Sequence, residues 1–276
     1  MLVLDVINTL MDEGKRLTKV ITCSPKHEYF HIDDPAAHNI IEVSNPEKAM
    51  RQHSKLRTVL KSFGSEVINV DEYVGHPNSV FTRDTALVTP HGYVKLNLGI
   101  ETRKGEERWM ARILDSLNEP CAGEIIEPGT IEGGDVILCG SVAFIGRTQR
   151  TNGKGIEQLS RILHKMDYDV RTVKLPDINL HLDQVIGVLG PGYLIYCQEL
   201  FTTRFFEGFD TVKSSCKEFN ANFICLGKEE IIAPAANVEV VNLAQEHGVK
   251  VHSIDLSEFA KGSGGPNCLI MPVVRI

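Results

Sequence analysis

The chain has 276 residues, of which 42% are hydrophobic and 24% charged, with a formal net charge of −7. This length allows a substantial buried core, and this composition is ordinary for a soluble globular protein. The acidic balance argues against a general nucleic-acid binder, which would carry a basic surface, and it weakly suits a cationic substrate.

The first residues, Met1–Leu10, are apolar but contain Asp5 and no basic lead-in, so they do not match a signal peptide. No apolar run approaches the roughly 18 residues that a membrane span needs. The seven cysteines are scattered without CxxC or metal-ligand spacing. We therefore predict a cytoplasmic protein without membrane contact, whose cysteines are reduced thiols.

A pattern of two apolar strands, an amphipathic helix and a short closing strand recurs at a period of roughly 50 residues. The first copy would combine the strand Val20–Cys23 and the helix Pro46–Phe63 with the C-terminal strand Cys268–Val274. The second has strands at 86–88 and 93–98, separated by a turn, and a helix at Glu106–Leu117. The strands are predicted from β-branched runs between Gly and Pro turns, and the helices from 3.6-residue apolar spacing.

Three further copies follow in chain order. Their predicted elements are the strands Val136–Cys139 and Val142–Gly146 with a helix at Gly155–Lys165, the strands Val185–Leu189 and Tyr193–Cys197, and the strands Phe223–Leu226 and Glu230–Ala233 with a helix at Val240–Glu246. One unit cannot bury its own apolar face, so we predict that five units close into a ring, as one α/β domain over residues 1–276. An open α/β sheet is the alternative.

Polar residues gather in four segments at the predicted strand ends: Asn78–Asp84, Glu132–Asp135, His181–Asp183 and Gly262–Cys268. Asp84, Glu132 and His181 are separated by 48 and then 49 residues (84 to 132, 132 to 181). In a ring of repeats, equivalent offsets place side chains at the same end of the central channel. We therefore expect these segments to converge on one substrate.

Cys268 follows a loop with three glycines and a serine, which lets backbone come close to a ligand. A thiol becomes nucleophilic where a nearby cation or donor favours the thiolate, and His181 is the natural acid or base partner. The alternative for Cys268 is a packed residue at the start of an apolar strand.

Asp84 and Asp183 offer carboxylates, and a planar guanidinium is bound well by paired carboxylates. The alternative for Asp84 is an ion pair with Arg83 or a helix cap. In the segment Glu132–Asp135, two glycines between two acids suggest a backbone squeezed beside a ligand, with Asp135 tying down the turn.

With these motifs the sequence resembles the guanidine-modifying enzymes, which include arginine deiminases, dimethylarginine dimethylaminohydrolases and amidinotransferases. The resemblance covers nearly the whole chain, through the segments 78–84, 128–135, 146–152, 181–183 and 264–268. It implies a five-bladed α/β propeller of ββαβ repeats, the pentein fold. The length is similar to that of the compact dimethylarginine hydrolases rather than the longer deiminases.

The resemblance also implies roles for individual residues. Cys268 would attack the guanidinium carbon, His181 would protonate the leaving amine and then activate water, and Glu132 and Asp84 would hold the guanidinium nitrogens. Arg103 and Arg150 would bind the α-carboxylate of the substrate. Asn78 and Phe81 would also bind the substrate. The implied product is citrulline, formed through a covalent thiouronium adduct without a metal or another cofactor.

Two positions depart from the compact methylarginine hydrolases, which often have an acid where this chain has Arg83 and a basic residue where it has Asp183. At both positions the chain is instead similar to the deiminases, which puts methylated arginine in doubt as the substrate.

Two other functions remain as alternatives at this point. An amidinotransferase would pass the amidino group to an amine, and a non-enzymatic binding protein on the same fold would resemble the ribosome anti-association factors. The sequence predicts a small guanidino compound as partner and no nucleic acid, and it leaves open whether the chain forms a homodimer.

Overall fold

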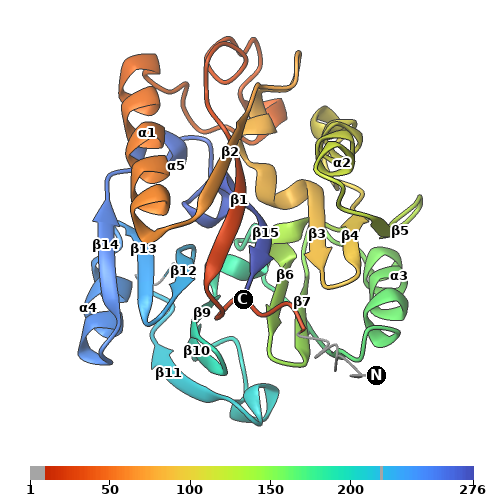
Figure 1. Cartoon of the computed structure of the whole chain (residues 1–276), viewed down its shortest axis with the longest axis vertical. Helices are drawn as coiled ribbons and strands as arrows, with labels where there is room; N and C mark the ends of the chain where they lie inside the picture. The colour runs from red at the N-terminus through yellow and green to blue at the C-terminus, as the bar shows by residue number, and fades with distance from the viewer. Residues whose placement is uncertain (1–9, 218–219) are drawn as a thin grey trace, which may run out of the picture.

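The structure is a computed structural model that describes residues 10–217 and 220–276. Five three-stranded sheets form a ring in which consecutive sheets follow one another along the chain (Figure 1). We call them blades 1 to 5, and they consist of β15–β1–β2, β3–β4–β5, β6–β7–β8, β9–β10–β11 and β12–β13–β14. The predicted ring of five units is confirmed, and the open sheet is not formed.

Every blade has the same topology. The strands are β1 Leu17–Cys23, β2 Glu66–Val70, β3 Ala86–Thr89, β4 Gly92–Lys95, β5 Cys121–Glu124, β6 Val136–Cys139, β7 Val142–Arg147, β8 Asp169–Lys174, β9 Ile186–Gly190, β10 Tyr193–Cys197, β11 Asp210–Ser214, β12 Ile224–Gly227, β13 Glu230–Pro234, β14 Lys250–Ile254 and β15 Met271–Arg275. In each blade the first-named strand pairs antiparallel with the middle strand, which pairs parallel with the third.

The strands named first are the inner strands of the ring, because β3, β6, β9 and β12 are buried along their whole length. The third strands, such as β2 and β8, are largely exposed. This gradient explains why the inner strands read as short continuous apolar runs rather than alternating ones.

Helices cover the outside of the ring at α1 Pro46–Phe63, α2 Glu106–Ser116, α3 Gly153–His164, α4 Val238–Glu246 and α5 Ser257–Ala260. Helix α1 begins where the Asn45 side chain accepts a hydrogen bond from the backbone of Lys48, and it ends at Gly64 with φ of 100°. Its buried face includes Leu56 and Leu60, which pack against blade 1. These start and stop signals are the ones that sequence patterns reveal best.

Blade 4 departs from the prediction that every unit contains an amphipathic helix. Between β10 and β11 the chain forms only a short 3₁₀ turn, Thr203–Phe206. The segment is rich in phenylalanine, and Phe205 and Phe206 pack against Phe144 of blade 3, with ring centroids 5.4 and 5.7 Å apart. These aromatic contacts cover the sheet where the other blades have a helix.

The cysteines are a second correction. Cys197, at the end of β10, forms a disulfide with Cys216, which follows β11. The prediction of reduced thiols is therefore wrong for this pair, whereas Cys268 is a free thiol. The cross-link joins the ends of two strands in the blade that lacks a helix. It stabilises the fold by lowering the conformational entropy of the unfolded chain.

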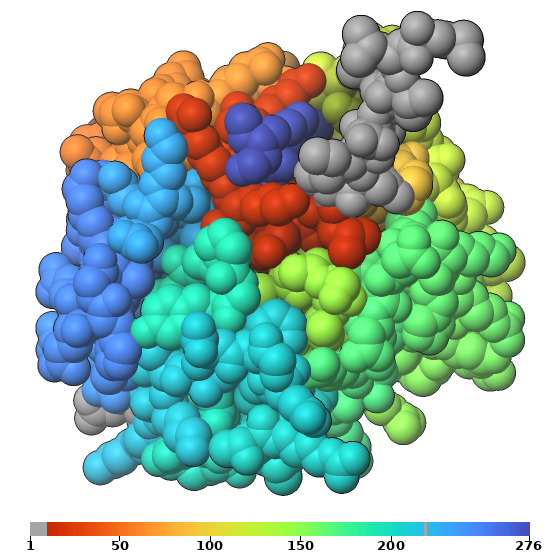
Figure 2. All heavy atoms as spheres, turned by 60° about the horizontal axis from the view of Figure 1, so that its bottom comes forward, coloured from red at the N-terminus to blue at the C-terminus, as the bar shows by residue number. Residues whose placement is uncertain are grey.

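Residues 10–16 cross the ring at the C-terminal ends of the inner strands, where Figure 2 shows the start of the chain lying between the blades. The backbone of Glu13 donates to Leu138, and that of Arg16 donates to Ile276. The Glu13 carboxylate is 2.5 Å from Nη2 of Arg83, whose side chain is buried. The predictions for Met1–Thr9 concern residues outside the described part of the chain.

Among the described residues, no helix is long and apolar enough to cross a membrane.

We expect Glu13→Gln to lower the free energy of unfolding by about 3 kcal/mol, because it leaves the buried Arg83 cation without its anionic partner. Urea unfolding of both proteins measures the difference. Glu47→Gln is the control, since Glu47 and Arg51 form an ion pair with side chains 83% and 70% exposed, and its loss should change little. Equal stability of the two variants would show that the Glu13–Arg83 pair does not support the ring.

Candidate active site

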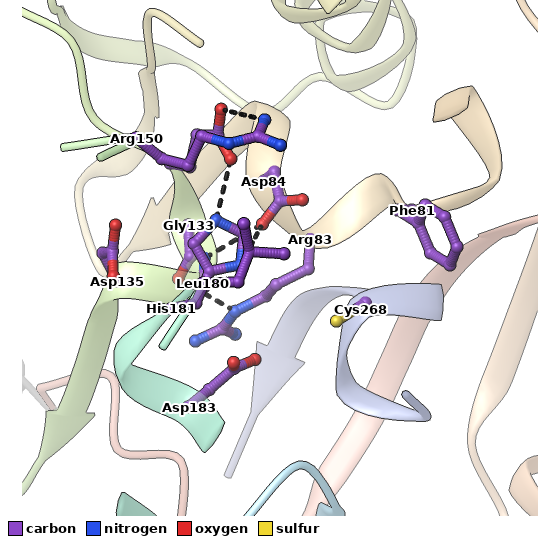
Figure 3. Close-up of polar contacts among 12 residues, drawn as sticks. Phe81, Arg83, Asp84, Gly133, Asp135, Arg150, Leu180, His181, Asp183 and Cys268 are labelled. Carbon is purple, nitrogen blue, oxygen red and sulfur yellow. Dashed lines mark hydrogen bonds and ion pairs between the residues drawn. The ribbon is translucent and has the colours of Figure 1, made fainter. Parts of the chain in front are cut away.

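The predicted site residues lie immediately before the inner strands of the blades. Because the blades are related by rotation, these positions share one end of the ring, opposite residues 10–16. The residues are Asp84 before β3, Glu132 before β6, His181 and Asp183 before β9, and Cys268 before β15. Figure 3 shows the side chains of Asp84, His181, Asp183 and Cys268 near one another, on separate elements. The expected convergence is therefore present in the structure.

Glu132 and His181 form the central contact of the site. The two carboxylate oxygens of Glu132 have different partners: Oε2 is 2.7 Å from Nε2 of His181, and Oε1 accepts from the backbone of Gly99 at 2.9 Å. Arg150 lies within 3.4 Å of the same Oε1 atom. Burial opposes the ionisation of Glu132, but the hydrogen bond and charge of His181 and the charge of Arg150 lower its pKa to about 2.

The histidine is surrounded by acids. Burial alone would lower the pKa of His181, but the charge of Asp84 and the hydrogen bond with Glu132 raise it to about 10. Asp135 adds to this field, and its Oδ1 accepts from the backbone of Leu182 at 2.9 Å. Asp135 therefore ties the histidine segment to blade 3, whereas the sequence suggested that it ties down its own turn. His181 is an imidazolium in the free protein at neutral pH.

Asp84 is fixed from two sides. Its Oδ1 accepts from the backbone of Gly134 at 3.1 Å, and its Oδ2 is 2.6 Å from Nη1 of Arg103. A Cβ atom on Gly134 would lie 2.6 Å from Nδ1 of His181, so only glycine fits between the two side chains. This close approach explains the paired glycines between Glu132 and Asp135.

Arg103 lies deeper than its predicted role requires. Its guanidinium is buried and donates hydrogen bonds to Asp84 and to the carbonyl oxygen of Phe81, the latter at 2.9 Å. Its Nε and Nη2 atoms both donate to the carboxylate of Glu106. The side chain lies against helix α2, where the carboxylates of Asp84 and Glu106 already neutralise its charge. Arg150 makes the weaker contact described above and remains 9% exposed.

The sulfur of Cys268 lies on the 3₁₀ turn Asn267–Leu269, before β15 rather than on a strand as predicted. Nδ2 of Asn222 donates to this sulfur at 3.1 Å. Burial, and then the charges of Asp183 and Asp84, raise the pKa of the Cys268 thiol, whereas the Asn222 hydrogen bond lowers it. Cys268 is therefore held as a protonated thiol in the free protein.

Asn222 was missed by the sequence analysis. It lies two residues before β12, which is the position in blade 5 that corresponds to the site residues of the other blades. That equivalence was the available signal, although an Asn before an apolar strand also fits an ordinary turn.

Asp183 lies beside the sulfur, on the 3₁₀ turn Leu182–Gln184. Its Oδ2 accepts from the amides of Asn222 at 3.0 Å and Asn267 at 2.9 Å, and its Oδ1 has no hydrogen-bond partner among the described residues. Burial raises the pKa of Asp183 to about 6. Arg83 points instead along the axis of the ring to Glu13, so it does not pair with its neighbour Asp84.

Asp84, Glu132, His181 and Cys268 line a cavity of about 20 Å³, enough for one water molecule, and Asp183 lies outside its lining. Asn78 and Phe81 line it, as do His38, Asn39 and Ser263. Asn78 donates to the carbonyl oxygen of His38 at 2.7 Å, and Ser263 donates to that of Asn39 at 2.9 Å. Segments from outside the inner strands thus border the cavity and narrow it.

The arrangement matches a known family. A sequence profile described as eukaryotic N,N dimethylarginine dimethylhydrolase matches residues 32–262. The chain belongs to this dimethylarginine dimethylhydrolase family. A relative, the dimethylarginine dimethylaminohydrolase of Pseudomonas aeruginosa, is 28% identical over 223 residues, which cover 80% of this chain and 87% of the relative.

Two further comparisons agree with this family. The arginine deiminase of Clostridium perfringens is 27% identical over 271 residues, covering 78% of this chain and 66% of the deiminase. A crystal structure of a dimethylarginine dimethylaminohydrolase adduct with 4-chloro-2-hydroxymethylpyridine has a TM-score of 0.81 and 25% identity, over 92% of this chain and 99% of that one.

These findings confirm the five-bladed α/β propeller and show that this family member is a hydrolase acting on guanidino groups. They do not favour the amidinotransferase alternative, and they are against a binding protein without enzymatic activity.

We expect Asn222→Leu to slow the alkylation of Cys268 by iodoacetamide roughly tenfold at a fixed pH of about 9, because a hydrogen bond to a charged group contributes about 1.5 kcal/mol. Leucine fills the same space but donates no hydrogen bond, so the thiolate fraction falls. Peptide mass spectrometry separates Cys268 from the exposed thiol of Cys121. Asn242→Leu, at an exposed site in the same blade, is the control; an unchanged rate in Asn222→Leu would remove Asn222 from the thiol chemistry.

Proposed function

We propose that the protein hydrolyses the guanidinium group of arginine or N-methylated arginine, giving citrulline and ammonia or a methylamine through a covalent adduct on Cys268. The observation that carries this proposal is the set of buried acids around one sulfur. Asp84, Glu132 and Asp183 face the Cys268 region with a single thiol among them, an environment suited to a delocalised cation beside a nucleophile.

The substrate cation activates the thiol. In the free protein, burial and the neighbouring carboxylates hold the Cys268 thiol protonated. A guanidinium bound by Glu132 and Asp84 brings a positive charge next to the sulfur, so the thiol proton is released to solvent and the thiolate forms. Activation therefore occurs only when a cationic substrate is present.

The thiolate then adds to the guanidinium carbon, and a carbon–sulfur bond forms. The imidazolium of His181 donates its proton to the departing nitrogen, the carbon–nitrogen bond breaks, and the amine leaves. A thiouronium adduct remains on Cys268. Neutral His181 next takes a proton from water, the water oxygen bonds to the carbon, and the carbon–sulfur bond breaks to release citrulline.

The remaining predicted residues would position the substrate. Arg150, at the edge of the cavity, is proposed to bind the α-carboxylate, and Asn78 and Phe81 to contact the substrate's chain. Arg103 was expected to share the carboxylate, but its bonds to Asp84 and Glu106 support a different role, which is to hold Asp84 in place. The small cavity implies that the segments of His38 and Ser263 move to admit the substrate.

Asp183 favours an unmethylated substrate. Its Oδ1 atom lacks a partner among the described residues and can accept an N–H from a terminal guanidinium nitrogen. Two methyl groups on that nitrogen would leave the buried acceptor unpaired, and sites that bind an N–H discriminate strongly against analogues without it. We therefore propose that arginine is a better substrate than dimethylarginine.

Incubation with arginine, monomethylarginine and dimethylarginine should yield citrulline, quantified by mass spectrometry, with the highest kcat/KM for arginine. Cys268→Ser should lose at least about 10³-fold in kcat because the adduct cannot form efficiently. The absence of citrulline from every arginine derivative would refute the proposed reaction. A new guanidino compound formed only when glycine or ornithine is added would instead support amidino transfer.

The pH dependence of kcat/KM should have two limbs. Activity should fall below about pH 6 as Asp183 becomes protonated and loses its charge for the substrate. It should also fall above about pH 10 as His181 loses the proton needed by the leaving amine. In Asp183→Asn the acid limb near pH 6 should disappear while the alkaline limb remains; an acid limb unchanged in this variant would contradict the assignment.

A further inference from the structure

A second, larger cavity lies on the other side of the glycine-rich segment that precedes Cys268. Its volume is about 450 Å³, and it shares Ser263 and Gly264 with the small cavity of the site. Asn222, Ala236 and Asp255 are among its other lining residues. The two cavities are therefore neighbours, separated by a short stretch of chain and the side chains packed against it.

Asn222 lies between the large cavity and the sulfur of Cys268. The residue lines the large cavity, while its Nδ2 atom is 3.1 Å from the sulfur of Cys268. A Cβ atom on Gly265 would lie 2.4 Å from Oδ1 of Asn222, so the glycine leaves room for the amide to stand there. One side chain thus divides the reacting atom from a cavity of about 450 Å³.

The lining of the large cavity suits small amines and water. Among the described residues that line it, there is one carboxylate, Asp255, and no Lys, Arg or His. A hydrogen bond from the backbone of Ser257 lowers the pKa of Asp255, which is therefore anionic at neutral pH. Amide groups and apolar side chains make up much of the rest. Asp255 also forms an ion pair with Lys48, whose Nζ lies 3.7 Å from its Oδ2, so the cavity offers a departing amine polar acceptors rather than an unpaired charge.

The proposed reaction requires such a route. After the first step, the amino-acid part of the substrate is bonded to Cys268 and fills the space beside it, where the free protein has only about 20 Å³ of free volume. The amine must nevertheless leave, and a water molecule must take its place. The side bordered by His38 and Asn39 is the side that the bound amino acid would block.

We propose that the large cavity is the passage through which the small amine product leaves and water enters, with Asn222 as its inner gate. This inference rests on the proposed function. The amine leaves with the proton given by His181, and the entering water returns a proton to His181 as its oxygen bonds to the adduct carbon. That proton completes the N–H bonds of the departing nitrogen, so the ligand of the passage is neutral ammonia or a small alkylamine, which becomes a cation only by taking a further proton from the solvent.

The chain offers a matched pair of variants for the test. Ala235 and Ala236 are both exposed, but only Ala236 lines the large cavity. Ala236→Trp should lower kcat roughly tenfold with little change in KM, since product release and water entry become limiting, and intact mass spectrometry should detect accumulated adduct. Ala235→Trp should match the unmodified protein. Equal kcat values for the two variants, whether both normal or both reduced, would overturn the passage.

A second measurement does not need turnover. Iodoacetamide is small and neutral, and its rate of reaction with Cys268 should be several-fold lower in Ala236→Trp than in Ala235→Trp, because the passage is one route to the sulfur. Equal labelling rates would also overturn the proposal. If no guanidino substrate is hydrolysed by the unmodified protein, the proposed function fails, and the labelling comparison still decides whether the passage reaches the thiol.

Discussion

The antiparallel pairing of β1 with β15 joins the two ends of the chain and closes the ring. It sets Ile21 opposite Met271, and the segment before β15 is thereby held beside the segments that precede the other inner strands. Cys268 lies in this segment and meets the side chains of Asn222 and Asp183 only when the ring is closed. The proposed nucleophile therefore lies near the C-terminal strand that closes the ring, and its contacts require more than a subset of blades.

The buried acids of the site are neutralised to different degrees, and this difference supports the proposed binding of a cation. Asp84 is paired with Arg103, and Glu132 with His181. Asp183 is held through neutral amides, and burial raises its pKa to about 6. Because amides stabilise a carboxylate less than a full charge does, Asp183 is the acid that gains most from a guanidinium beside Cys268.

The sequence predicted those features that depend on local pattern. Inner strands were visible as β-branched runs between turns, and the equal spacing of Asp84, Glu132 and His181 revealed their convergence. The missing helix of blade 4 depends on Phe205 and Phe206 packing onto a different blade, which no local pattern reports. The sequence could not predict which way the Arg83 side chain points, because its partner Glu13 lies in a segment before the first repeat.

The small cavity is bordered by two residues in unfavourable backbone conformations. Ser263 and Asn39 have φ of 60° and 56°, and the Ser263 hydroxyl donates to the carbonyl oxygen of Asn39 across the cavity. A left-handed conformation costs a non-glycine residue about 1 kcal/mol, less for Asn, which is similar in size to one hydrogen bond. The local terms for this arrangement therefore nearly cancel, and a ligand with modest differential affinity is enough to shift the segment. Because Ser263 and Gly264 line both cavities, such a shift changes the access to Cys268 from both sides at once.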